Sequence, residues 1–148
     1  MTDDPDFDLA RFETAQETIY GTAMEELRKG RKRTHWMWYV FPQFAGLGHS
    51  STAKRYAIGS VAEAKAFWAH GPLQRRLRRA TELVLSHRDR PIEAIFGDPD
   101  YLKFRSCMTL FGACVGVPEL FQAALDAFFD GEPDERTLSL LQERGSGL

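Results

Sequence analysis

The amino-acid sequence predicts a mainly α-helical fold, in one domain of about seven helices. Apolar residues recur at steps of three and four along most of the chain, helix start and stop signals follow at short intervals, and only one run has strand-like composition. A chain of 148 residues, 43% of them hydrophobic, can bury roughly 70% of its unfolded surface. We expect the domain to span 1–148, with an ordered core over 8–143 and short flexible ends.

The first helix is expected from Leu9 to Lys29, because apolar side chains recur there with helical spacing. Asp8 is placed to cap its N-terminus, and Gly30 to follow its last turn. The aromatic run "HWMWYVF" comes next and has the composition of a strand. No second strand is apparent to pair with it, so we expect a short helix or a buried irregular segment, stopped at Phe41 by the following proline.

Seven further segments carry helix signals. Ser51 to Ile58 is expected to be a short helix, and Ser60 with Glu63 forms a capping box for a helix through Ala69. Pro72 is expected at the first helical position of the segment 72–87. Four more helices are expected over 91–96, 99–116, 118–131 and 135–144. The last three have start signals, which are Asp98 as N-cap, Pro118, and Pro133-Asp134 respectively.

Composition and charge exclude several classes of protein. A net charge of −2 gives no global field for binding nucleic acid or an anionic membrane. The acidic start of the chain does not resemble a secretory signal, and no apolar run is long enough to span a membrane. We therefore expect a cytoplasmic protein without a membrane partner. Cys107 and Cys114 are expected to be buried, reduced thiols, and no motif indicates a metal or a cofactor.

The aromatic and glycine-rich stretch from Thr34 to Ser51 is the first candidate site. Trp36 and Trp38 could stack on a base or a sugar, with Gln43 making hydrogen bonds, although core packing is the alternative role of these aromatic residues. The loop "GLGHSS" precedes a helix and could bind a phosphate. This anion site would use Gly46, Gly48, Ser50, Lys54 and Arg55. The alternative is a turn in which Ser50 or Ser51 caps the helix.

Two basic clusters are the second candidate. "RKGRKR", from Arg28 to Arg33, places five cations in six residues, and the helix from Pro72 carries an arginine face. Such clusters can follow a phosphate backbone, which makes a protein- or nucleic-acid-interaction module the alternative function. They can equally complement a helix C-terminus or cover a solvated face. The arginine face consists of Arg75, Arg76, Arg78 and Arg79.

Acid-base chemistry could be performed by His35 and Asp98, the two catalytic candidates, with Glu63 and Asp100 as further carboxylates. Ser106 and Lys103 lie on the helix that opens near Asp98, and Ser106 is included as a ligand-binding candidate. The patterns GxSxG, HExxH and CxxC are all absent. Serine hydrolase, zinc protease and zinc-ribbon functions therefore lack support.

The chain resembles a bacterial and fungal family of unknown function that is often labelled calpastatin automatically. The resemblance covers most of Leu9 to Leu141 and is most specific in "HWMWYVFPQFAGLGHS", with "AKRYAI" and "SCMTLF" further along. In the family a serine is usual where this chain has Cys107. Calpastatin-type inhibitors resemble disordered chains, whereas this composition is that of a compact domain, so the label does not fit. The helical organisation is also distantly similar to NADAR proteins, whose members include glycosidic-bond hydrolases.

These observations support one preferred function and two alternatives. The preferred function is binding a nucleotide or ADP-ribose-type ligand, a small phosphate-bearing molecule, with cleavage of an N-glycosidic or ADP-ribose-related bond if the protein is an enzyme. Nucleic acid is the alternative partner. In the second alternative, the aromatic stretch has no ligand and is only part of the core.

Overall fold

The computed structural model describes residues 7–116 and 118–145 and is mainly α-helical, as the sequence predicts. The predicted flexible ends fall, except at their inner edges, outside these residues. The described residues form nine helices rather than about seven, in this order: α1 (Ala10–Arg28), α2 (Met37–Val40), α3 (Ser51–Tyr56), α4 (Val61–Ala69), α5 (Gly71–Leu85), α6 (Ile92–Phe96), α7 (Asp100–Cys114), α8 (Glu119–Phe129) and α9 (Glu135–Gly145).

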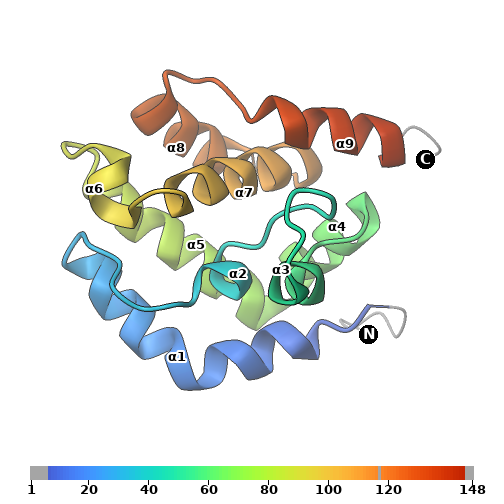
Figure 1. The fold of residues 1–148 in the computed structure, drawn as a ribbon, viewed down its shortest axis with the longest axis horizontal. Coiled ribbons are helices and arrows are strands. Elements are labelled where there is room, and N and C mark those ends of the chain that lie inside the picture. The colour runs from blue at the N-terminus through green and yellow to red at the C-terminus, as the bar shows by residue number, and fades with distance from the viewer. Residues whose placement is uncertain (1–6, 117, 146–148) are drawn as a thin grey trace.

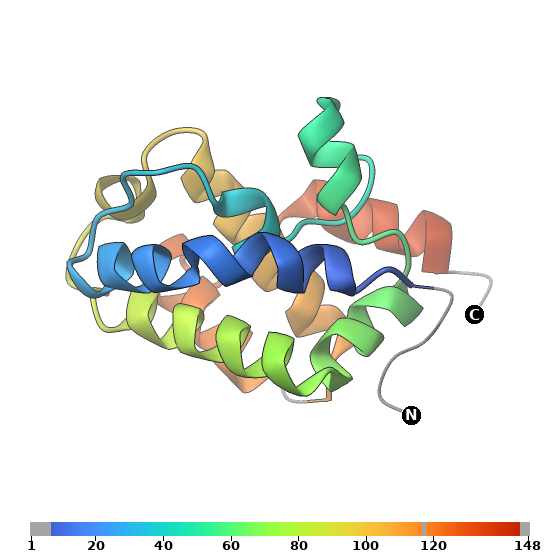
Figure 2. The same ribbon diagram turned by 90° about the horizontal axis from the view of Figure 1, so that it is seen from below.

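Helices α1 and α5 run side by side in the same direction, so that their C-terminal ends lie at one end of the molecule, opposite the C-terminal end of α9 (Figures 1 and 2). Helix α8 packs against both α5 and α7, and α9 packs against α7. The core between these helices is rich in aromatic rings, which make edge-to-face and tilted pairs. Its largest fully buried side chains include Phe12, Trp36, Phe41, Phe44, Phe67, Phe104, Phe111 and Phe121.

The aromatic run forms the short helix α2 and ends at Phe41, as expected. Among the described residues there is no strand, only an isolated bridge between Phe44 and Ile58. In this bridge Ala45 N–H donates to the Ile58 carbonyl at 2.8 Å, and Ile58 N–H donates to the Gln43 carbonyl at 2.9 Å. The bridge closes a loop that carries α3, and α3 stands out from the rest of the protein in Figure 2.

Several helix ends confirm the sequence signals. Gly30 follows α1 with a φ of 80°, and Gly97 ends α6 with a φ of 77°, both in the left-handed region that favours glycine. Ser60 Oγ accepts from Glu63 N–H at 3.0 Å at the start of α4. Before α9, Asp134 Oδ2 accepts from Thr137 N–H. These ends were predictable because capping depends on residues close together in sequence.

Three predicted starts are wrong. Leu9, not Asp8, is the N-cap of α1, and no side chain caps that end. Asp98 does not cap α7, because the helix begins after Pro99 and again no side chain accepts from its first turn. Helix α5 begins at Gly71, one residue before Pro72. Its N-cap is His70, an imidazole whose Nδ1 accepts from Leu73 N–H at 3.3 Å and whose Nε2 lies 3.1 Å from Glu13.

Both cysteines are buried and free, as expected. Burial raises the pKa of each thiol. No helix in the described part of the chain combines the length and the apolar character that a membrane span requires.

Candidate functional site

The loop between α1 and α2 is organised around one carboxylate, that of Glu26. Its Oε1 accepts from the backbone N–H groups of Arg33 and Thr34 and from the indole Nε1–H of Trp36, and its Oε2 accepts from the Thr34 hydroxyl. Burial alone would raise the pKa of Glu26, but these hydrogen bonds outweigh it and lower the pKa to about 2. The ionised carboxylate therefore fixes where α2 begins.

Trp36 is an interior residue. Its side chain is completely buried, so neither face of its indole is open to a ligand. Besides the bond to Glu26, its ring lies 5.2 Å from Lys32 Nζ and 6.3 Å from the Phe41 ring. For Trp36, the alternative of core packing is the one that the structure supports.

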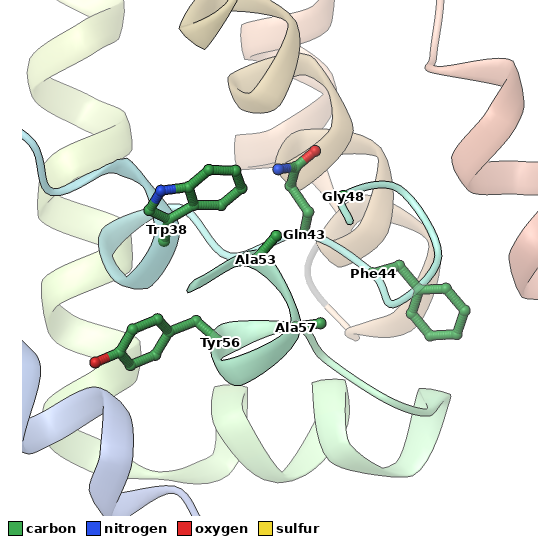
Figure 3. Close-up of a pocket in the computed structure, with 7 residues that line it drawn as sticks. All are labelled: Trp38, Gln43, Phe44, Gly48, Ala53, Tyr56 and Ala57. Carbon is green, nitrogen blue, oxygen red and sulfur yellow. The ribbon is translucent and has the colours of Figure 1, made fainter. Parts of the chain in front are cut away.

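Trp38, unlike Trp36, lines a cleft between α2, the following loop and α3 (Figure 3). In Figure 3 its indole and the Gln43 carboxamide project into the same space. The residues lining the cleft are Trp38, Gln43, Phe44, Gly48, Ala53, Tyr56 and Ala57. The enclosed volume is about 10 Å³, which is room for one water molecule. A larger ligand would therefore contact these residues at the mouth of the cleft.

Gln43 is the polar group of this cleft. Its side chain is half-buried, and no described residue hydrogen-bonds its carboxamide. The carboxamide can donate and accept at once, the pattern that matches the edge of a purine base. Gln43 can therefore hydrogen-bond the edge of a planar ligand while Trp38 contacts its face.

An ion-pair chain adjoins the cleft on the α7 side. Lys103 Nζ lies 3.7 Å from the centre of the Trp38 ring and 3.1 Å from Asp100 Oδ1, and Lys32 Nζ lies 2.8 Å from Asp100 Oδ2. Burial alone would raise the pKa of Asp100, but the hydrogen bonds from the two lysines lower it. Asp100 is therefore an anion at neutral pH, suited to stabilising positive charge rather than to donating a proton.

The C-terminal side of α3 is held to α1 by Arg11. Its Nε donates to the Arg55 carbonyl at 2.7 Å, and its Nη2 donates to the Ala57 carbonyl at 2.8 Å. The same Nη2 lies 2.9 Å from Glu63 Oε2 in an ion pair that is nearly buried. Glu63 Oε1 in turn accepts from Gly59 N–H. Arg11 thus positions the segment that carries Tyr56 and Ala57 into the cleft.

The predicted anion site at the start of α3 is only partly assembled. Ser50 is the N-cap, and its Oγ accepts from Ala53 N–H at 3.1 Å, which is the alternative role expected for it. Lys54 and Arg55 lie in the last turn of α3 rather than its first, so they are not beside the N–H groups of the helix start. Both are exposed, and Arg55 Nε donates to the Tyr56 hydroxyl.

Four other predicted residues lie outside the cleft lining. His35 and Asp98, the two catalytic candidates, are both exposed. Ser106 is buried within α7, where its hydroxyl donates to the Leu102 carbonyl at 3.1 Å. Gly46 has a φ of 103°, and a Cβ there would lie 3.1 Å from Leu140. Gly46 therefore serves the turn and its packing against α9.

The arginine face of α5 is partly used within the protein. Arg76 donates to Gln16 Oε1 at 3.2 Å and lies over the Tyr20 ring, and Arg78 lies over the Trp68 ring. Arg75 and Arg79 are exposed. Among the described residues no group of three or more His, Cys, Asp or Glu could hold a metal ion.

Gly48 allows the loop to close over the cleft, and its replacement by alanine tests this packing. A Cβ at Gly48 would lie 2.6 Å from the Ala53 Cβ and 3.7 Å from the Trp38 ring. We expect Gly48→Ala to lower stability by about 1–3 kcal/mol, as overpacking does, measured by urea unfolding. Gly21 in α1 is the control, because nothing lies within 4 Å of its would-be Cβ. Gly21→Ala should instead stabilise by about 1 kcal/mol through helix propensity. Equal effects of the two changes would contradict the close packing.

Sequence reasoning missed the partnership of Lys32, Asp100 and Lys103, and it missed Tyr56 as a cleft residue. Lys32 lies in a basic run whose composition is typical of a solvated surface, yet its side chain is only 7% exposed. Asp100 and Lys103 are three residues apart on α7, a spacing that does predict their contact. No local signal places Lys32 beside them, because the two segments are 68 positions apart in the chain.

Comparisons with known proteins give a family and a fold. A family model described as "Protein of unknown function (DUF1810)" matches residues 6–141. The chain is similar in structure to a conserved hypothetical protein from Mycobacterium tuberculosis, Rv1873, whose crystal structure is solved. The TM-score is 0.91 at 50% sequence identity, with 93% of this chain and 98% of that chain covered. None of the curated proteins compared matches the chain.

Proposed function

The chain belongs to the DUF1810 family of unknown function, and from its cleft we propose that it binds a nucleotide or ADP-ribose-type ligand. The base lies at the mouth of the cleft, against Trp38, which is partly exposed. The observation that carries this proposal is the Gln43 carboxamide, which lies beside Trp38 and has no hydrogen-bond partner among the described residues. An indole face with an unpaired amide next to it matches the face and edge of a nucleobase.

The phosphate-bearing part of the ligand is assigned to cations near the cleft. Lys103 lies over the Trp38 ring, and Lys54 is exposed in the last turn of α3. The N-terminus of α3 is not used in this proposal, because the Ser50 hydroxyl already accepts a hydrogen bond from one of its backbone N–H groups. The distant likeness in helical organisation to NADAR proteins makes ADP-ribose one of the ligands to test.

The proposal is tested by calorimetric titration with adenosine, AMP and ADP-ribose. Replacing Gln43 with leucine should weaken adenosine binding by about tenfold, since a hydrogen bond to a buried ligand edge contributes about 1 kcal/mol or more. Trp38→Leu should weaken it by a similar or larger factor, because stacking on an aromatic ring contributes about 1–3 kcal/mol per base. Gln142→Leu, at an exposed glutamine of α9, is the matched control and should leave binding unchanged.

Adenosine has no phosphate, so its binding reports on the cleft alone. If the wild-type protein binds neither adenosine nor a nucleotide, or if Gln43→Leu and Gln142→Leu behave alike, the proposal fails. Chromatography of the titrated ligand detects any release of free base, which would assign N-glycosidic cleavage in addition to binding. In that case Asp100→Asn tests whether an ionised carboxylate near the cleft stabilises the charge that builds on the sugar.

A further inference from the structure

Helices α1 and α5 both finish at one end of the molecule (Figures 1 and 2). Residues at this end line a groove that the proposed function does not use. It consists of two adjoining hollows, of about 520 and 240 Å³, which share Arg31 and Arg90 in their walls. Neither hollow shares a lining residue with the cleft at Trp38. We call this feature the basic groove.

The walls of the basic groove are fixed by hydrogen bonds between distant segments. Lys32 N–H donates to the Ile95 carbonyl at 2.7 Å, which ties the α1–α2 loop to α6. Arg90 Nη1 reaches the carbonyls of Lys29 and Gly30, each at 3.3 Å. These contacts satisfy carbonyls at the end of α1 and hold Arg90 opposite Arg31. The groove is therefore a built feature of the fold rather than a gap between loops.

Positive charge exceeds negative charge in this groove. Its cations are Lys29, Arg31, Lys32, Arg33 and Arg90, and its carboxylates are Glu25, Glu26 and Glu93. Glu25 is neutralised by ion pairs with Arg28 and Lys29, whereas Glu26 keeps its negative charge and is stabilised by four hydrogen bonds from the loop. Lys32 is paired with Asp100. Arg31, Arg33 and Arg90 then exceed the two remaining carboxylates, Glu26 and Glu93, by one positive charge.

Helix dipoles lower this excess of positive charge. Each helix C-terminus carries about half a negative charge, so α1 and α5 together contribute about one unit. Arg90 and His87 already contact the carbonyls at the end of α1. Arg31 and Arg33 are exposed, and neither guanidinium has a partner among the described residues. Two arginines therefore remain available to a ligand.

We propose that the basic groove binds an oligophosphate group, meaning two or more linked phosphates. Guanidinium groups bind phosphate oxygens through paired, charge-assisted hydrogen bonds. Arg31 and Arg90 line both hollows while Arg33 lines only the smaller one, so the cations can contact successive phosphates. The one aromatic residue in these walls, Phe96, is 5% exposed and offers no face for stacking a base. The groove therefore recognises phosphate without a base, in contrast to the cleft.

The test uses inorganic tripolyphosphate as the probe, titrated calorimetrically at about 0.15 M salt, where distant charges are screened. The double variant Arg31→Gln/Arg33→Gln should weaken binding by at least about tenfold, the effect of losing charge-assisted hydrogen bonds. Arg90 is left intact because it also caps α1. The matched control is Arg75→Gln/Arg79→Gln, which removes the same charge from exposed positions on α5 and should change the affinity less than about twofold.

Removing the negative charge of Glu93 gives an effect of opposite sign. Glu93→Gln should tighten tripolyphosphate binding, because it removes a like charge from the groove. The proposal is overturned if wild-type protein does not bind tripolyphosphate, or if the two arginine double variants weaken it equally. It is also overturned if a single-stranded oligonucleotide binds at the groove but tripolyphosphate does not, which would assign the surface to nucleic acid. Adenosine binding should be the same in wild type and Arg31→Gln/Arg33→Gln, which separates this site from the cleft.

Discussion

Replacing Glu26 with glutamine is expected to lower the free energy of unfolding by about 3 kcal/mol or more, because a buried carboxylate with four donors is lost. A glutamine side chain has one accepting oxygen and brings two N–H donors of its own to a position where every neighbour donates. Trp36 Nε1–H, which is buried, would lose its acceptor. Urea unfolding at neutral pH measures the change.

The Glu26 carboxylate also makes the stability of the protein depend on pH. The pKa of Glu26 is lowered from 4.5 to about 2 in the folded protein, and a shift of this size corresponds to about 3 kcal/mol. Because the folded pKa is the lower one, this contribution is complete above pH 4.5 and is lost as the pH falls toward 2. Urea unfolding across this range should show a steeper loss of stability in wild type than in Glu26→Gln.

Glu17→Gln is the control for both measurements, because Glu17 is exposed on the same helix. It should leave stability at neutral pH nearly unchanged and keep the wild-type acid dependence. If Glu26→Gln is no more harmful than Glu17→Gln, the hydrogen bonds to the carboxylate do not stabilise the loop before α2. Near-ultraviolet circular dichroism adds a local readout, since Trp36 would lose its fixed environment.

Replacing Arg11 with methionine is the second change expected to have a large effect. Breaking a buried ion pair by removing one partner costs roughly 3–5 kcal/mol, and here the Arg55 and Ala57 carbonyls lose their donor as well. Methionine retains part of the apolar volume, so the loss reports mainly on the guanidinium. Thermal and urea unfolding measure the change in stability.

Arg11→Met should also weaken adenosine binding, because the segment that carries Tyr56 and Ala57 is no longer held in position. Arg136→Met, at an exposed position on α9, is the matched control and should change neither property. The double variant Arg11→Met/Glu63→Gln should recover part of the stability, since Glu63 is no longer left as an uncompensated buried charge. An Arg11→Met protein as stable as Arg136→Met would refute the role of Arg11 as a clamp.

Local signals in the sequence account for most helices and for part of the candidate site. The helix ends at Gly30, Ser60 and Gly97 follow from backbone preferences of the residues themselves. The prediction that the aromatic run is not a strand followed from the absence of a pairing partner. Trp38, Gln43 and Gly48 were expected to share a ligand site, and they do line one cleft. That a ligand binds there stays a prediction.

Other predictions failed because a residue's role depended on its distant neighbours. Asp8 and Asp98 have good capping side chains, yet the helices begin elsewhere, and His70 takes the capping role at α5. Lys54 and Arg55 were assigned to the start of α3 but lie in its last turn, since the helix ends at Tyr56. Trp36 and Trp38 are two residues apart in one motif, and only their packing separates a core residue from a cleft residue.

The sequence by itself determined that this protein is helical, where most of its helices end and which segment holds the cleft, because these properties depend on local backbone preferences and on hydrophobic spacing. Only the tertiary structure decided which polar and charged groups meet. Arg11 meets the end of α3, and Arg90 lies beside Arg31, across long separations in the chain. Glu26 is within ten positions of its partners, yet it meets them only because the loop before α2 folds back against α1. The electrostatic energy of such contacts depends on distance and burial, and a single sequence encodes neither directly.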